Sequence, residues 1–318
     1  MNPPYLPIPR NIIIDVSNAC NLRCKTCPQG QQLVMHPSRP MCLEDFIQLL
    51  DKLQELFPPV ENAEGNTTGV KLYSWAEPLL NPEVGAMIHE VKRRGYATIL
   101  SSNLMPSVSS RLTEYPLDVL IITVSGFTQG VYEHNHDGGD IEIVKSNLAG
   151  IMKSQKEKGY PKLVKVKYLV GEHNEHEVDD FRKFVTTLPG NIVFLNHSGP
   201  LRMLGRTREL GLQTMPAGVG EHVPGLCYSY RNAQGMCKKL GRDFQLVIRA
   251  DGAVFPCCSI QYDDRLSLGN IFTDDPAVIL TSERFLRLQN TRLTGPESIC
   301  FEGWDSEFVN QSGLGKVQ

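Results

Sequence analysis

Residues 11–27 read Asn11-Ile-Ile-Ile-Asp-Val-Ser17, then Asn-Ala, then Cys20-Asn-Leu-Arg-Cys24-Lys-Thr-Cys27. The β-branched run that ends in polar residues is typical of a buried strand feeding a loop. The loop then spaces its thiols as C-x3-C-x2-C, close enough to hold corners of an iron–sulfur cube, for which thiolates are the usual ligands. Three ligands for four irons leave one iron open, and an open iron can bind a small chelating molecule.

Strands and helices alternate downstream of this loop. The predicted helices are Leu43–Leu56, Pro82–Arg94, Ile141–Gln155 and Val178–Leu188, and the predicted strands are Gly69–Tyr73, Ala97–Leu100, Val119–Val124, Leu163–Val170 and Asn191–Leu195. Such alternation implies parallel pairing through right-handed crossovers. About six units are visible, fewer than the eight of a closed barrel. We therefore predict an α/β fold, a partial (β/α)6 TIM-like barrel with its active site at the carboxyl ends of the strands.

The chain of 318 residues is expected to divide into three regions. A barrel core covers residues 1–200, and a linker or substrate loop rich in Gly, Pro and Arg covers 201–226. A C-terminal domain, 227–318, holds five of the nine cysteines. It also contains the hairpin-like stretch Phe244–Phe255, in which Asp251-Gly252 supports a tight turn.

Composition and charge argue against a nucleic-acid-binding, a membrane or a secreted protein. A net charge of −3 gives no attraction to polyanions, so nucleic acid is not an expected partner. No run of apolar residues is long enough for a membrane helix, and the N-terminus lacks the apolar region of a secretion signal. We therefore expect a cytoplasmic protein without a membrane partner. In a reducing cytosol, cysteines serve as thiols or metal ligands rather than disulfides.

The cysteine triplet after a first strand resembles the radical S-adenosylmethionine superfamily, although Thr26 stands where that superfamily usually has an aromatic residue. The resemblance implies a [4Fe–4S] cluster on Cys20, Cys24 and Cys27, with S-adenosylmethionine bound at the open iron. The alternatives are three unligated thiols, or a zinc knuckle completed by a distant ligand such as His36.

A second match follows the predicted strand Gly69–Tyr73. The segment Ser74-Trp-Ala-Glu-Pro-Leu-Leu80 resembles the superfamily's Gly-Gly-Glu-Pro element, whose backbone holds the amino group of the cofactor, with larger residues before Glu77-Pro78. Polar residues that end the next two strands suit the ribose and carboxylate of the cofactor, or they cap helices and turns. The cofactor-binding residues implied by the resemblance are Ala76, Glu77, Pro78, Ser102, Asn103 and Ser125.

The second cysteine group spaces Cys237, Gly252 and Cys257 as C-x14-G-x4-C. This spacing resembles the opening of the SPASM or Twitch extension, and Pro296-x3-Cys300 follows in the order usual for that module. The resemblance implies a C-terminal Twitch/SPASM-type iron–sulfur domain with one auxiliary [4Fe–4S] cluster. Its implied ligands are Cys237, Cys257 and Cys300, with Cys227 as the fourth. A zinc ion held by four thiolates is the alternative.

Cys258 adjoins the predicted ligand Cys257, and adjacent side chains on an extended segment point to opposite faces. If Cys257 turns to the cluster, Cys258 turns away, either into packing or toward the substrate, where it can return a hydrogen atom. The compact layout with one auxiliary cluster, together with Ser125-Gly-Phe-Thr-Gln129 and Gly138-Gly-Asp140, resembles carbohydrate-acting members and among them aminoglycoside epimerases of the neomycin and hygromycin type. The resemblance implies an epimerase that inverts a carbon of an aminoglycoside or aminosugar by 5′-deoxyadenosyl-radical hydrogen abstraction, with Cys258 as catalytic residue.

Other functions remain open. A dehydrogenase of an aminocyclitol or sugar alcohol would need a base such as Arg202 or Lys167. A peptide-modifying maturase and a non-catalytic iron–sulfur carrier are further alternatives. A polycationic substrate would favour an acidic cavity, and the acidic residues expected near strand ends are Asp137, Asp140, Glu172, Glu175 and Glu177. A reducing partner such as flavodoxin or ferredoxin is expected to supply the electron.

Overall fold

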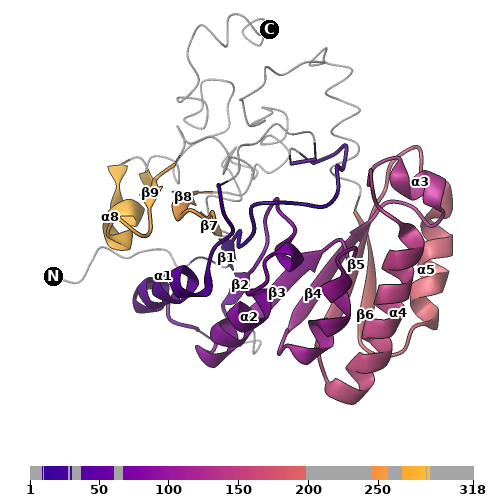
Figure 1. The fold of residues 1–318 in the computed structure, drawn as a ribbon, viewed down its shortest axis with the longest axis horizontal. Helices are drawn as coiled ribbons and strands as arrows, with labels where there is room; N and C mark the ends of the chain where they lie inside the picture. The colour runs from indigo at the N-terminus through magenta and orange to yellow at the C-terminus, as the bar shows by residue number, and fades with distance from the viewer. Residues whose placement is uncertain are drawn as a thin grey trace, which may run out of the picture.

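The structure is a computed structural model that describes residues 9, 11–27, 29–30, 37–60, 67–197, 245–256, 267–283 and 285–286. Its centre is one sheet with the strand order β6-β5-β4-β3-β2-β1-β7-β8-β9 (Figure 1). The strands are β1 (Asn11–Ile14), β2 (Gly69–Lys71), β3 (Ala97–Ser102), β4 (Val119–Val124), β5 (Leu163–Leu169), β6 (Ile192–His197), β7 (Gln245–Ile248), β8 (Ala253–Phe255) and β9 (Gly269–Asn270).

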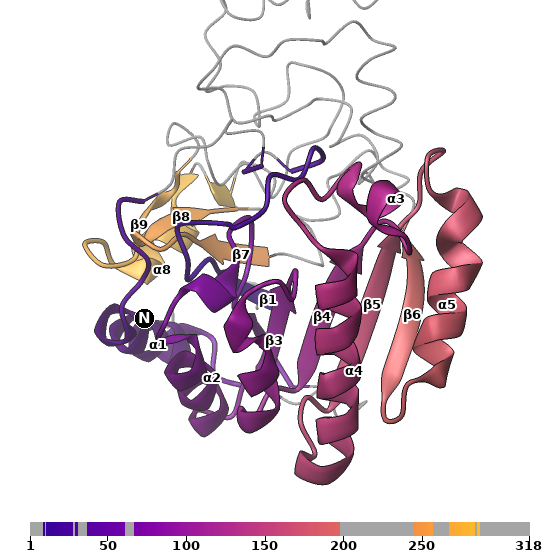
Figure 2. The same ribbon diagram turned by 45° about the vertical axis from the view of Figure 1, so that its right-hand side comes forward.

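Strands β1 to β6 are all parallel and lie in sequence order, which confirms the predicted partial barrel. The helices are α1 (Leu43–Leu56), α2 (Val84–Arg93), α3 (Gln129–Glu133), α4 (Ile141–Lys158), α5 (Val178–Thr187) and α8 (Pro276–Thr281), and the short 3-10 helices are η1 (Pro78–Leu80), η2 (Ser107–Glu114) and η3 (Glu175–Glu177). Figure 2 shows α1, α2 and α4 on one face of the strands. None of the described helices combines the length and apolarity that a bilayer crossing requires.

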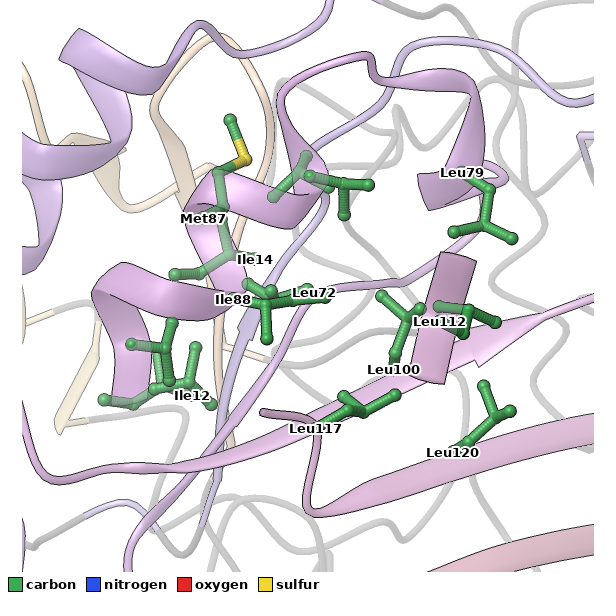
Figure 3. Packing of buried hydrophobic residues seen from close by; sticks show 14 of the residues in the cluster. Ile12, Ile14, Leu72, Leu79, Met87, Ile88, Leu100, Leu112, Leu117 and Leu120 are labelled. Atoms are coloured by element: carbon green, nitrogen blue, oxygen red, sulfur yellow. The ribbon is translucent and has the colours of Figure 1, made fainter. Parts of the chain in front are cut away.

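The main core lies between these helices and the sheet. In α1 the buried residues Phe46, Leu49, Leu50 and Leu53 follow the helical repeat, so one stripe of the helix faces the strands. Figure 3 shows how α2 closes the next part of the core, with Met87 and Ile88 packed near Ile14 and Leu72. This apolar layer fixes the strand spacing, and it leaves the opposite face of the sheet without a helix from the barrel units.

A C-terminal hairpin extends the barrel sheet rather than forming a sheet of its own. Strand β7 pairs parallel with β1, and β8 returns antiparallel to β7, which confirms the predicted hairpin. Gly252 makes the turn at φ +85°, and a Cβ there would lie 2.3 Å from the ring of Phe272, so only glycine fits. The expected boundaries at 200 and 226 fall outside the described residues and stay predictions.

Candidate functional site

The cysteine loop begins where β1 ends. Figure 1 shows this indigo loop at the same end of the sheet as α3, which follows the carboxyl end of β4. Asp15 anchors its start, because the Asp15 amide donates to the carbonyl of Ile248 at 2.8 Å and the Asp15 carboxylate accepts from the Trp75 amide at 3.1 Å. The first residue of the loop thus joins β1 to β7 and to the segment after β2.

A tight turn brings the second and third cysteines together. The Cys27 amide donates to the Cys24 carbonyl at 3.1 Å. Gly30 then packs on the Cys24 backbone so closely that a Cβ would lie 2.4 Å from the Cys24 nitrogen and oxygen. A side chain at residue 30 would therefore push the turn open, which makes Gly30 part of the loop's local geometry.

The segment after α3 braces the cysteine loop from the other side. The Arg23 amide donates to the Asp137 carbonyl and the Lys25 amide to the Asn135 carbonyl, both at 2.9 Å. The Thr26 amide donates to the Asn135 side-chain oxygen at 3.2 Å. These three bonds hold the loop in one conformation from Arg23 to Thr26, so the thiols are positioned by the fold rather than by a metal alone.

The three thiols lie half-buried in this loop. Burial, together with the charges on Glu77 and Cys27, raises the pKa of Cys20 to about 11. Burial also raises the pKa of Cys24 and of Cys27, and for Cys24 the neighbouring Cys27 and Cys20 act in the same direction. Thiolates in a low-dielectric site need a cation to stabilise them, and a metal centre supplies it.

The arrangement fits an iron–sulfur cube better than a single ion. No group of three or more His, Cys, Asp or Glu side chains among the described residues converges so as to hold one metal ion. A zinc knuckle needs such convergence, whereas a cube binds each thiolate at a different corner and so tolerates wider separation. His36, the alternative fourth ligand, lies outside the described residues. The all-thiol donor set is also the one iron–sulfur clusters use.

His136 contacts the cysteine loop directly, a contact that the sequence reasoning missed. Its Nδ1 lies 3.2 Å from Cys24 Sγ, and its ring stacks on Tyr132 at 4.6 Å between centroids. Burial lowers the pKa of His136 to about 4, so the ring is neutral at pH 7. The signal available in the sequence was the run His134-Asn-His-Asp137 soon after a predicted strand.

Several buried polar atoms in this region have no partner among the described residues. They are His136 Nε2, Tyr132 Oη, Asn135 Nδ2 and Ser125 Oγ. Buried polar groups are normally hydrogen-bonded, so four unpaired atoms close to the carboxyl end of β4 indicate room for a polar group that binds there. This observation and the thiol donor set both fit an S-adenosylmethionine-binding cluster site.

Glu77 joins the second motif to the cysteine loop. Its amide donates to the Ala19 carbonyl at 2.9 Å, and its buried carboxylate accepts from the amides of Asn103 at 2.9 Å and Leu79 at 3.1 Å. Burial raises the pKa of Glu77 to about 7, against these hydrogen bonds, which lower it. The Glu77 carboxylate is therefore a structural clamp, and Ala76 and Pro78 are buried beside it.

The polar residues at the ends of β3 and β4 lie in different environments. Asn103 Nδ2 donates to Asn21 Oδ1 at 2.9 Å and lies 3.9 Å from Cys20 Sγ. Ser102 Oγ accepts from the Leu104 amide at 3.0 Å, so its hydroxyl supports a turn. Ser125 is fully buried; its carbonyl accepts from Asn174 Nδ2 at 2.9 Å, and its hydroxyl has no hydrogen-bond partner among the described residues. Of the three, Asn103 is the one that directly contacts the cysteine loop.

The acidic residues expected near the substrate divide into two groups. Asp140 caps α4, accepting from the Glu142 amide at 2.8 Å, and Glu177 accepts from the Phe127 amide at 2.6 Å. These two are structural. The other three are exposed: Asp137, Glu172 and Glu175.

Several predicted residues lie outside the described part of the chain. They are the expected auxiliary-cluster ligands Cys227, Cys237, Cys257 and Cys300, the expected hydrogen donor Cys258, and the base candidate Arg202. Lys167, the other base candidate, is described: it lies half-buried on β5.

Comparisons with known proteins bear on both halves of the chain. Residues 237–312 match the SPASM family, an iron–sulfur cluster-binding domain. The chain is 24% identical over 306 residues to the tungsten-containing aldehyde ferredoxin oxidoreductase cofactor-modifying protein of Pyrococcus furiosus, covering 86% of this chain and 81% of that protein.

Solved structures resemble the chain at low identity. The structure of BtrN in complex with AdoMet and 2-DOIA matches with a TM-score of 0.50 at 16% identity, over 89% of this chain and 86% of BtrN. Streptococcus suis SuiB bound to the precursor peptide SuiA matches with a TM-score of 0.60 at 12% identity, over 93% of this chain and 70% of SuiB. At these identities the likeness shows a shared fold. The SPASM match begins at Cys237, the first cysteine of the C-x14-G-x4-C spacing.

Proposed function

The chain has the fold of the radical S-adenosylmethionine enzymes and a SPASM iron–sulfur cluster-binding domain, and from this premise we propose that it cleaves S-adenosylmethionine to start radical chemistry on a substrate. The observation that carries the proposal is the loop after β1, which places Cys20, Cys24 and Cys27 at the carboxyl end of the parallel strands. When bound, the cluster and S-adenosylmethionine supply a carbon radical that removes an unactivated hydrogen atom.

The residues of this chain position that chemistry. The three thiolates would hold three irons, while Asn135 and Asp137 keep their loop in place. Glu77 ties the loop to the end of β3 through Asn103. The Glu77 carboxylate already accepts hydrogen bonds from two backbone amides. The backbone around Ala76 and Pro78 is therefore the part of this segment that would bind the amino group of the cofactor.

The reaction class we propose first is epimerisation, with hydrogen returned by Cys258. What supports it is the position of Cys258 beside Cys257 inside the region that matches the SPASM family. The second candidate is a dehydrogenase, in which the substrate radical loses an electron and a proton instead of regaining a hydrogen atom. The observation that favours the second candidate is Lys167, whose pKa burial lowers, as a base needs.

Isotope transfer separates the two candidates. In deuterated water, an epimerase that uses a thiol donor incorporates one deuterium at the inverted carbon, and Cys258→Ala abolishes the product. A dehydrogenase yields an oxidised product that Cys258→Ala still forms and that Lys167→Met abolishes. Full epimer formation by Cys258→Ala would exclude the thiol donor.

The proposed function itself is tested without any substrate. We expect anaerobically reconstituted protein to form 5′-deoxyadenosine from S-adenosylmethionine and dithionite. The triple variant Cys20→Ala/Cys24→Ala/Cys27→Ala should lose this activity together with about four iron atoms per chain, one [4Fe–4S] cluster. Cys42→Ala, which removes a thiol at the start of α1, is the matched control and should retain both. Unchanged iron in the triple variant would contradict the proposal.

A further inference from the structure

Strand β5 presents two lysines on the face of the sheet opposite the helices. Along the strand Val164, Val166 and Tyr168 are buried in the main core, and the Tyr168 ring lies 5.9 Å from that of Phe181 in α5. Side chains alternate along a strand, so Lys165 and Lys167 point to the other face. Both are half-buried there.

Side chains of the two neighbouring strands flank the lysines on this face. Lys165 pairs in register with Ile121 and Val193, and Lys167 pairs with Thr123 and Leu195. The β6 side chains on this face, Val193 and Leu195, are 37% and 42% exposed. Among the described residues, the two lysines therefore border a partly apolar surface that is exposed on the β6 side and closed on the β4 side, where Ile121 is buried. Thr123 adds a hydroxyl beside Lys167.

The described strands place lysines but no carboxylates on this surface. Strands β1 to β6 contain no aspartate or glutamate. Neither Lys165 nor Lys167 forms an ion pair with a carboxylate of any described residue. Their Cα atoms are about 6.6 Å apart, the length of two residues along a strand. Both burial and the charge of Lys165 disfavour the charged form of Lys167. An anion between the two ammonium groups would relieve both effects.

We propose that Lys165 and Lys167 form an oxyanion subsite, so that the substrate is an acid bearing a carboxylate or a phosphate. The inference rests on the proposed function, since Lys167 lies two residues before the carboxyl end of β5, the end of the sheet where the cysteine loop lies. A polycationic aminoglycoside would meet like charges here. The acidic residues that would attract it are exposed or bonded to backbone amides.

Pyridoxal 5′-phosphate is a suitable probe, because its aldehyde forms an imine with a lysine amine, releasing water, and borohydride reduces the imine to a stable amine. We expect labelling of Lys165 or Lys167 in the full-length protein to exceed that of exposed Lys183 by at least about tenfold, since a bound phosphate raises the local aldehyde concentration. Pyridoxal, which lacks the phosphate, is the matched control and should show a much smaller preference for Lys165 or Lys167 over Lys183, because only the reactivity of the amines then differs. Peptide mass spectrometry locates the label.

Competition identifies the anion. Protection by inorganic phosphate but not by malonate indicates a phosphate-bearing substrate, and the reverse indicates a carboxylate. Labelling that is equal at Lys183, or protection by neomycin in place of either anion, would overturn the proposal. The measurement requires no cleavage of S-adenosylmethionine, so failure of the subsite and failure of the proposed function are observed separately.

Discussion

At the scale of single residues, the environment of Cys24 differs from that of the other two predicted ligands. His136 Nδ1 lies 3.2 Å from Cys24 Sγ, and the buried ring is neutral. A neutral imidazole has one N–H, and with the proton on Nδ1 it donates to the sulfur. Hydrogen bonds to ligand sulfurs are one of the ways a protein sets a cluster's potential.

His136→Phe is therefore expected to make the reduction potential of the reconstituted cluster more negative. Losing one hydrogen bond of about 1 kcal/mol shifts a one-electron couple by roughly 40 mV. Potentiometry followed by electron paramagnetic resonance measures this shift independently of activity. His134→Phe is the control, because His134 is exposed and its ring contacts His173 instead. An unchanged potential in His136→Phe would show that the contact carries no hydrogen bond to the thiolate.

At the scale of elements, Asp118 joins four parts of the barrel. Its carboxylate accepts from Lys92 of α2 at 2.7 Å, from the Thr98 amide of β3 at 2.9 Å and from Lys162 before β5 at 3.0 Å. Burial raises the pKa of Asp118, but these bonds outweigh it and hold the pKa below its ordinary value of 3.8. Asp118 itself precedes β4 directly, so one carboxylate sets how these elements meet.

Asp118→Asn should lower the free energy of unfolding at pH 7 by about 1–3 kcal/mol, because it removes an acceptor for partly buried donors. A depressed pKa stabilises the fold above the ordinary value, and this contribution is lost as pH falls through the folded value. The difference between the two proteins should therefore shrink below about pH 4, as denaturant unfolding at several pH values would show. Asp180→Asn, at an exposed pair with Lys183, should have little effect. A difference that persists unchanged in acid would contradict this account.

At the scale of the whole molecule, the sheet is continuous from β6 to β9. The pairing of β7 with β1 covers what would otherwise be an unpaired strand edge of the barrel. A small cluster of Ile13, Val247, Ala253 and Phe255 packs across this junction. The hairpin, which lies within the SPASM-matching residues 237–312, and the barrel therefore share both backbone hydrogen bonds and buried apolar surface.

Phe255→Ala is expected to destabilise the barrel and the hairpin together, by about 3–5 kcal/mol, since Phe255 is fully buried in this cluster. Circular dichroism should record one cooperative transition that moves to lower denaturant. Val278→Ala, on the exposed side of α8, should leave the transition in place. Two separate transitions, with only one of them shifted, would mean that the hairpin unfolds independently of the barrel.

The sequence by itself determined the helices and strands whose pattern of apolar residues repeats between near neighbours in the chain. The helix Leu43–Leu56 and the strand Val119–Val124 were predicted with the bounds that the structure has, because helical and strand periodicities are set by neighbouring residues. The cysteine spacing likewise identified the loop after β1. Glu77 was found from the resemblance of its segment to the Gly-Gly-Glu-Pro element, and Asn103 from its place at the end of a strand.

Only the tertiary structure decided which distant segments meet. It placed His136 on Cys24, paired β7 with β1, and turned Lys165 and Lys167 to the face of the sheet opposite the helices. No local pattern encodes these contacts, because they depend on which strand edge is free and on how two loops pack at the same end of the sheet. The Glu77 carboxylate shows the same limit: its motif was visible in the sequence, but its role as a buried clamp follows from amides that the fold brings to it.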